Sequence, residues 1–109
     1  MSNDPWRNAR VMYEKDTCAR KMGIELIEMD DGFAQMSMTV SADMLNGHQT
    51  CHGGQLFTLA DTAFAYACNS QGLAAVASAA SIDFLRPAFA GDRLIATARV
   101  KQQGELTGV

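Results

Sequence analysis

One acidic side chain stands apart from every other charge in the middle of the sequence. Asp61 is the only charged residue between Asp43 and Asp83, and it falls within a stretch that is predicted to be helical. Its neighbours one turn away are Phe57, Thr58, Phe64 and Ala65. A carboxylate in such surroundings costs free energy unless it is paired or hydrated. The residue is therefore either a solvated acid on a helix face or a desolvated acid that serves as base or nucleophile, and the lack of a nearby Lys or Arg favours the second interpretation.

The segment that leads into this helix could bind an anion or a developing negative charge. Residues 46–54 read Asn-Gly-His-Gln-Thr-Cys-His-Gly-Gly. The glycine pair Gly53-Gly54 lets a ligand approach the backbone closely, and the unpaired N–H groups at a helix start carry partial positive charge. Asp61 lies about 12 Å further along the helix, too far for one chain to bring both groups to the same atom. Antiparallel pairing with a second molecule would close that distance, so the spacing predicts a site shared across a two-fold dimer.

Other chemistry in this loop is less favoured. His48, Cys51 and His52 lack a recognised metal-ligand spacing, so no metal site is expected. Cys51 and His52 are adjacent and rarely face each other well enough to form a nucleophile pair. Asn46 and His48 could simply cap the loop. The glycine pair is not a P-loop, because no Gly-Lys-Ser/Thr follows it.

The elements that must position these residues follow in a simple order: a helix, a hairpin, a long helix and further strands. Alternation places Ala34, Met36, Met38 and Val40 on one face of a strand, and Leu94, Ala96, Ala98 and Val100 on one face of another. The first expected element is a helix that is capped at Asn3-Asp4-Pro5 and stops at Gly23, followed by strands over 24–31 and 33–40 that are joined by a turn at 30–32. A long helix is then expected over 55–71, ending at Gly72. Strand-like runs follow over 74–85 and 94–102, on either side of a turn at 86–92. This pattern predicts an α+β fold with an antiparallel sheet curved around the alanine-rich long helix.

The composition excludes several classes of protein. Of the 109 residues 19% are charged, the net charge is −3, and the only adjacent basic pair is Arg20-Lys21, so nucleic acid is not an expected partner. No apolar run is long enough to span a membrane, and the polar N-terminus lacks a signal-peptide core, which predicts a cytoplasmic location. Cys18, Cys51 and Cys68 are odd in number and are expected to be reduced thiols.

The length predicts one domain over residues 1–109. The segment from Gly104 to Val109 begins a strand without completing it. We therefore expect the domain to lack its C-terminal strand or strands.

Taken together, these motifs resemble the hotdog-fold acyl-CoA thioesterases, and among them the PaaI type of phenylacetic acid degradation. The resemblance extends from about Trp6 to Val109. It rests on Asn46, His52-Gly53-Gly54, Ala60-Asp61, Ser81-Ile82-Asp83-Phe84-Leu85-Arg86-Pro87-Ala88 and Gly91-Asp92. It implies a hotdog fold, in which an antiparallel sheet wraps a long central helix. It also implies active sites at the interface of a homodimer, with dimers pairing into a homotetramer.

The resemblance also implies the chemistry. The substrate would be an arylacetyl-CoA, such as phenylacetyl-CoA or a ring-hydroxylated form, with coenzyme A as part of the substrate and no separate cofactor. The Gly53 N–H would polarise the thioester carbonyl, Asn46 would hold water or orient the substrate, and His52 would have a supporting role. The partner subunit's Asp61 would be the nucleophile or the general base for water.

Candidate substrate contacts are Gly54, Phe57 and Arg86, the last toward the nucleotide phosphates. Some relatives use a serine on the strand after the long helix, but neither Ser78 nor Ser81 matches that position cleanly. An alternative function is that of a non-catalytic acyl-CoA sensor, which would need no acid at position 61. A hotdog dehydratase is less favoured, because those enzymes usually pair a histidine with an acid in a differently placed motif.

Overall fold

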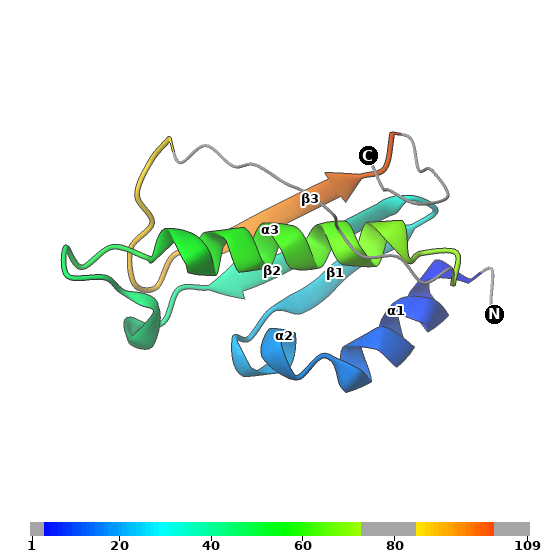
Figure 1. Ribbon diagram of the computed structural model, residues 1–109, viewed down its shortest axis with the longest axis horizontal. Coiled ribbons are helices and arrows are strands. Elements are labelled where there is room, and N and C mark those ends of the chain that lie inside the picture. The colour runs from blue at the N-terminus through cyan, green and yellow to red at the C-terminus, as the bar shows by residue number, and fades with distance from the viewer. Residues whose placement is uncertain (1–3, 73–84, 102–109) are drawn as a thin grey trace.

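The computed structural model describes residues 4–72 and 85–101, and the structural statements below concern these residues. The elements are α1 (Pro5–Lys15), α2 (Thr17–Lys21), β1 (Glu25–Asp30), β2 (Phe33–Thr39), a 3-10 helix (Ala42–Met44), α3 (Gly53–Cys68) and β3 (Arg93–Arg99). Figure 1 shows α3 lying along the strands, with α1 and α2 beside β1. The predicted α+β fold is confirmed. The strand-like run over 74–85 lies outside the described residues except for its last residue.

The sheet is antiparallel, with the strand order β1-β2-β3. Asp30 pairs with Phe33, so the β1–β2 connection is a two-residue turn at Asp31-Gly32. Gly32 has a φ of 65°, a conformation that glycine adopts at little cost. The hairpin predicted from the Asp-Asp-Gly sequence is therefore confirmed, and its tight turn fixes which residues of β2 face α3.

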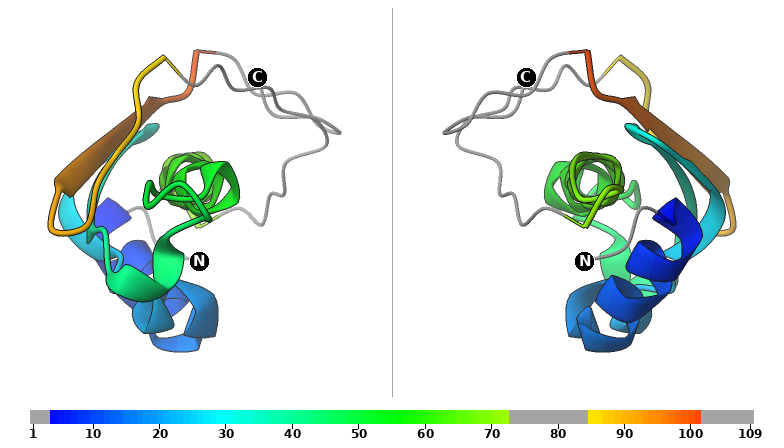
Figure 2. Two further views of the ribbon diagram at one scale, coloured as in Figure 1. Left: turned by 90° about the vertical axis from the view of Figure 1, so that its left-hand side faces the viewer. Right: turned by 90° about the vertical axis from the view of Figure 1, so that its right-hand side faces the viewer.

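The core lies between one face of the sheet and α3. Ala34, Met36, Met38 and Val40 are at most 2% exposed, as the alternation along β2 predicts. Leu94, Ala96 and Ala98 on β3, and Val100 just after it, are partly buried and pack against this core. Figure 2 shows α3 end-on, beside the face of the curved sheet. Each large apolar side chain buried here stabilises the fold by about 1.5–3 kcal/mol, so the sheet holds α3 in a fixed position.

The prediction of a single helix between Pro5 and Gly23 was wrong, because the chain forms two helices, α1 and α2, that are separated at Asp16. Asp16 has φ −89° and ψ 79°, outside the helical region. Its carboxylate caps α2 by accepting a hydrogen bond from the Ala19 N–H (3.1 Å), and it also accepts one from the Tyr66 hydroxyl (3.1 Å). Burial, followed by the neighbouring Asp16 charge, raises the pKa of Tyr66. The break therefore anchors the N-terminal helices to the buried face of α3.

The predicted caps and helix limits were largely correct. Asp4 caps α1 by accepting hydrogen bonds from the N–H groups of Trp6 (3.1 Å) and Arg7 (3.2 Å), and Pro5 is the first helical residue. The long helix begins at Gly53 rather than at residue 55 and ends at Cys68, before the predicted stop at Gly72. None of the helices in the described ranges has the length and apolar character needed to cross a membrane.

Candidate active site

No side chain caps the N-terminus of α3. His52 is the residue before the helix, and its side chain makes no capping hydrogen bond. Its carbonyl accepts from the N–H groups of Gln55 (3.0 Å) and Leu56 (3.3 Å). The N–H groups of Gly53 and Gly54 donate to no acceptor within residues 4–72 and 85–101. These two donors, at the positive end of the helix dipole, can stabilise a carbonyl oxygen that becomes negative.

The loop before α3 is folded around the Asn46 side chain. Asn46 Oδ1 accepts hydrogen bonds from the His48 N–H (2.9 Å), the Thr50 N–H (3.2 Å) and Thr50 Oγ1 (3.2 Å). A backbone N–H can only donate, so the atom facing these groups must be the oxygen of the carboxamide. The amide nitrogen is therefore turned away from the loop and remains available as a donor. Asn46 therefore caps the loop, which was one of its two predicted roles.

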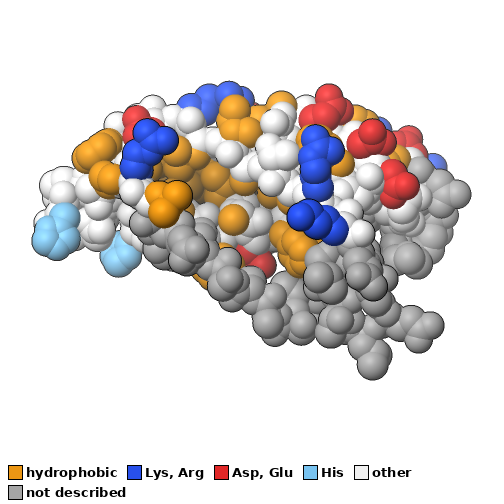
Figure 3. Space-filling view, turned by 90° about the horizontal axis from the view of Figure 1, so that it is seen from above, with side chains coloured by type: hydrophobic (Ala, Val, Ile, Leu, Met, Phe, Trp, Pro, Cys, Tyr) orange, Lys and Arg blue, Asp and Glu red, His pale blue; other side chains and the backbone are white. Residues whose placement is uncertain are grey.

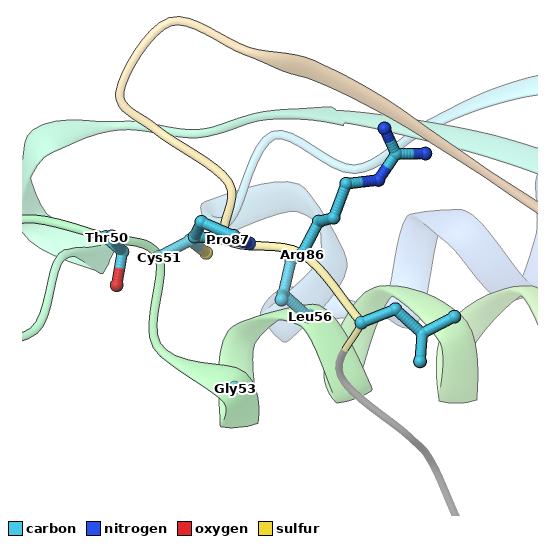
Figure 4. Close-up of a pocket in the computed structure, with 7 residues that line it drawn as sticks. Thr50, Cys51, Gly53, Leu56, Arg86 and Pro87 are labelled. Carbon is cyan, nitrogen blue, oxygen red and sulfur yellow. The ribbon is translucent and has the colours of Figure 1, made fainter.

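A pocket of about 280 Å³ opens beside the first turn of α3. Its lining is shown in Figure 4 and consists of Thr50, Cys51, Gly53, Leu56, Leu85, Arg86 and Pro87. The Cys51 N–H donates to the Ala88 carbonyl (2.8 Å), which holds the segment before β3 against the lead into α3. In Figure 4 the Arg86 side chain extends away from Gly53, so its guanidinium lies off the start of the helix. The pocket thus brings together two of the predicted residues, Gly53 and Arg86.

Sequence reasoning missed the other walls of this pocket. Leu85 and Pro87 come from a segment far along the chain, which the Cys51–Ala88 hydrogen bond holds here. Thr50 had a local signal, because a threonine close after an asparagine in a turn often shares its hydrogen bonds. No comparable signal marked Leu56, whose spacing is that of an ordinary core residue.

Cys51 is an unsuitable nucleophile. Its side chain is 5% exposed, and burial raises the pKa of the thiol. The reactive form of cysteine is the thiolate, so a raised pKa lowers reactivity at neutral pH. The Sγ atom also lies 3.6 Å from the His52 carbonyl oxygen as a weak donor. This supports the low weight given to a Cys51–His52 pair.

Asp61 lies on the face of α3 turned away from the sheet. The residues of α3 that face the sheet, such as Leu59 and Ala63, are buried, whereas Asp61 is exposed. The polar side chains near it bond to the helix itself: Thr58 Oγ1 to the Gly54 carbonyl (2.9 Å) and Thr62 Oγ1 to the Thr58 carbonyl (2.6 Å). Asp61 is the only charged residue of α3. Within the described residues Asp61 therefore agrees with the solvated-acid interpretation, and the favoured desolvation is not seen.

The predicted site residues therefore form two groups. Asn46 lies in the loop before α3, and His52 and Gly53 lie at the start of the helix, although only Gly53 of these three lines the pocket. Asp61 does not line the pocket either and is about 12 Å further along the helix. Gly54 is exposed next to Gly53, and Phe57 is half-buried. Neither Gly54 nor Phe57 lines the pocket beside Gly53. The Gly53 N–H and the Asp61 carboxylate of one chain are therefore too far apart to act on the same substrate atom.

Both histidines of the chain lie at the end of the molecule where α3 begins. His48 and His52 are exposed, and Figure 3 shows them on the surface at one end, with hydrophobic side chains gathered in the middle of the same view. Across the described ranges, no group of three or more His, Cys, Asp and Glu side chains is placed to hold a metal ion.

Comparison with known proteins identifies the class to which this fold and site belong. Residues 48–109 match the family described as the thioesterase superfamily. The match covers more than half of the chain and includes the start of α3, Asp61 and β3. The chain belongs to the thioesterase superfamily, and its fold is the hotdog fold of that superfamily.

Particular relatives are closely similar. Acyl-coenzyme A thioesterase PaaI of Escherichia coli (strain K12) is 71% identical over 109 residues, which is all of this chain and 78% of that protein. The solved structure of the E. coli PaaI protein from the phenylacetic acid degradation operon has a TM-score of 0.93 at 70% identity, over 98% of this chain and 78% of the other. The TT0310 protein of Thermus thermophilus has a TM-score of 0.78 at 39% identity, over 83% and 76% of the two chains. The resemblance to PaaI-type thioesterases is confirmed.

Proposed function

We propose that this protein is an acyl-CoA thioesterase that hydrolyses arylacetyl-CoA, such as phenylacetyl-CoA or a ring-hydroxylated form, to the free acid and coenzyme A. The observation that carries the proposal is the uncapped start of α3, where the Gly53 and Gly54 N–H groups have no acceptor among residues 4–72 and 85–101 and Gly53 lines a pocket. The 71% identity to a relative named acyl-coenzyme A thioesterase supports the reaction. The source of the matched structure in a phenylacetic acid degradation operon supports the acyl group.

The proposed reaction uses groups from the loop before α3, from the first residue of α3 and from the middle of this helix. The Gly53 N–H donates to the thioester carbonyl oxygen and stabilises the negative charge that develops there. Asn46, whose amide nitrogen points away from its loop, donates to the same oxygen or to the attacking water. His52 supports this arrangement as the residue before the helix. Each of these groups acts on the carbonyl and leaves the attack to a separate acid.

The acid in this proposal is the partner subunit's Asp61. As general base, its carboxylate takes a proton from water while the water oxygen bonds to the carbonyl carbon. As nucleophile, its oxygen bonds to that carbon to give an anhydride, which water then hydrolyses. In both routes the C–S bond breaks, the sulfur keeps the electron pair, and the thiolate of coenzyme A takes up a proton. Both routes need a second chain, because the Gly53 and Asp61 of one chain are about 12 Å apart.

The proposed assembly is a homodimer that pairs into a homotetramer in the cytoplasm. Gly54, Phe57 and Arg86 are the proposed substrate contacts. Arg86 lines the pocket beside Gly53, and its guanidinium extends outward, where it can reach the phosphates of coenzyme A. Light scattering of the purified protein measures the assembly directly.

The first experiment is a thiol-release screen of acyl-CoA esters. Phenylacetyl-CoA and ring-hydroxylated forms are compared with acetyl-CoA and long-chain acyl-CoA at equal concentration. We expect the arylacetyl esters to have the highest kcat/KM. Binding of acyl-CoA without thiol release would contradict catalysis and favour the sensor function instead.

The second experiment tests the shared site. Asp61→Ala protein is mixed with Gly53→Pro protein under conditions in which subunits exchange. Each variant alone should have strongly reduced activity, whereas a mixed dimer contains one site with both native groups. We expect partial recovery of activity. No recovery, with mixed dimers shown to form, would contradict a site built from two chains.

A further inference from the structure

We propose that Thr50 is a positioning residue for the reaction, acting through Asn46. This inference rests on the proposed function, because Asn46 has a catalytic role only if the thioester is hydrolysed. Thr50 is half-buried and lines the pocket beside Gly53. Figure 4 places it at the end of the pocket where the loop enters.

Thr50 makes two hydrogen bonds to one atom. Both its N–H and its Oγ1 lie 3.2 Å from Asn46 Oδ1. The same oxygen also accepts from the His48 N–H at 2.9 Å. An oxygen that already accepts two backbone N–H groups is an acceptor for the hydroxyl too, so the Thr50 hydroxyl must donate. The carboxamide is thus held by three donors, and its rotation would break all three bonds.

Two consequences for Asn46 follow. Its amide nitrogen is held on the side opposite the three donors, which fixes the direction in which it can donate. In addition, hydrogen bonds accepted by the oxygen of an amide polarise it and make its N–H groups stronger donors. Thr50 therefore both orients and activates the donor, without itself touching the reacting atoms.

The loop does not depend on this hydroxyl for its fold. The Asn46 N–H donates to the Thr50 carbonyl (2.8 Å), and the His52 N–H donates to the Met44 carbonyl (2.8 Å). The Cys51 N–H donates to the Ala88 carbonyl (2.8 Å). All these bonds are made by the backbone and survive a change of the Thr50 side chain. Removing the hydroxyl therefore changes the hold on Asn46 and little else.

The test compares Thr50→Val with Thr50→Ser in the full chain, assayed by thiol release from phenylacetyl-CoA. We expect Thr50→Val to lower kcat about 3- to 10-fold, the effect of one neutral hydrogen bond, with KM changed less than about 2-fold. Thr50→Ser keeps the hydroxyl and should retain kcat within about 2-fold of the wild type. In an Asn46→Ala background, Thr50→Val should have no further effect, because the group it positions is gone.

Thr97→Val is the matched control. The Thr97 hydroxyl accepts a hydrogen bond of the same length, 3.2 Å, from Gln35 Nε2, on the sheet face opposite α3. The Thr97→Val substitution should leave kcat unchanged. Circular dichroism should show that all variants are folded. A Thr50→Val protein as active as the wild type overturns the positioning role, as does an equal loss in the Asn46→Ala background. A wild-type protein that releases no thiol from any acyl-CoA instead overturns the proposed function, and this inference with it.

Discussion

Among residues 4–72 and 85–101, the starts of the three α-helices are built in two different ways. Asp4 caps α1 and Asp16 caps α2, each with a carboxylate that accepts backbone N–H groups of the first turn. His52 precedes α3 and makes no such bond, and two glycines follow it. A missing cap costs a helix about 1 kcal/mol.

The capped helix starts have a structural role, whereas the uncapped start of α3 is the one proposed to act in the reaction. At α1 and α2 the chain supplies its own acceptors, so the donors of the first turn are used within the fold. At α3 the donors of Gly53 and Gly54 remain available beside a pocket. The same contrast holds along α3, where the hydroxyls of Thr58 and Thr62 bond to the helix while the Asp61 carboxylate is exposed. The groups left without an internal role are those proposed to act on the substrate.

The largest expected effect is that of removing the Asp61 charge. Asp61→Asn keeps the size of the side chain but can neither accept a proton from water nor attack as a carboxylate. We expect kcat for phenylacetyl-CoA to fall about 100-fold or more, as measured by thiol release. Because Asp61 is exposed in the single chain, the free energy of unfolding should change by less than about 0.5 kcal/mol.

Asp31→Asn is the control for loss of one negative charge. Asp31 is exposed in the β1–β2 turn, near the other end of α3, where the Gly32 N–H donates to Ser70 Oγ (2.8 Å). An Asn-Gly turn suits this hairpin, so stability and activity should both be retained. An Asp61→Asn protein with the activity of this control would exclude Asp61 from the reaction.

The next effect is that of removing one donor from the start of α3. Gly53 is the first helical residue, where proline is tolerated, and His52 has φ −56° and ψ 135°, which suits a residue before proline. Gly53→Pro therefore deletes the N–H while keeping the helix. We expect kcat to fall about 10- to 100-fold.

Gly53→Ala adds a side chain but keeps the N–H, and so separates the loss of the donor from steric bulk. It should retain most of the activity. If both variants lose activity equally, crowding rather than the missing donor is the cause.

Most of the fold could be predicted from the sequence because its signals are local. The alternation along β2 and the turn at Asp31-Gly32 determine both the buried face and the hairpin register. The break at Asp16 was missed because the spacing of the apolar residues continues across it. Its signal is local, since aspartate is a favoured helix-capping residue and the Asp16 carboxylate accepts from the Ala19 N–H at 3.1 Å. Only the hydrogen bond from the Tyr66 hydroxyl to the same carboxylate is long-range and could not be predicted from the sequence.

The candidate site divides in the same way. Asn46, His52 and Gly53 are close in sequence, so their places in the loop before α3 and at the start of that helix follow from local order along the chain. The pocket wall formed by Leu85 and Pro87 depends on a distant hydrogen bond from Cys51 to Ala88, which no local pattern reveals. The exposure of Asp61 agrees with the solvated-acid interpretation, which was the less favoured of the two because no Lys or Arg is nearby in sequence.

A smaller effect is expected from giving α3 the cap that it lacks. His52→Asp places a carboxylate where it can accept from the N–H groups of the first turn. We expect the free energy of unfolding to rise by about 0.5–1 kcal/mol, and kcat to fall about 10-fold because the donors are occupied and a negative charge faces the developing oxyanion. Thermal denaturation and thiol release measure the two effects. His52→Ala, which adds no cap, should not gain stability, and a stabilised His52→Asp protein with full activity would show that the start of α3 takes no part in the reaction.

The smallest effect is expected at a helix start that is already capped. Asp4→Ala removes the acceptor for the N–H groups of Trp6 and Arg7 at the start of α1. The free energy of unfolding should fall by about 1 kcal/mol, measured by urea denaturation. Asp4→Ser keeps a capping oxygen and should recover most of this loss. Because α1 packs against β1 and not against the pocket beside Gly53, kcat should stay at the wild-type value. A fall in kcat for Asp4→Ala but not for Asp4→Ser would mean that the capped and uncapped helix starts are coupled, and that the division of roles between them is incomplete.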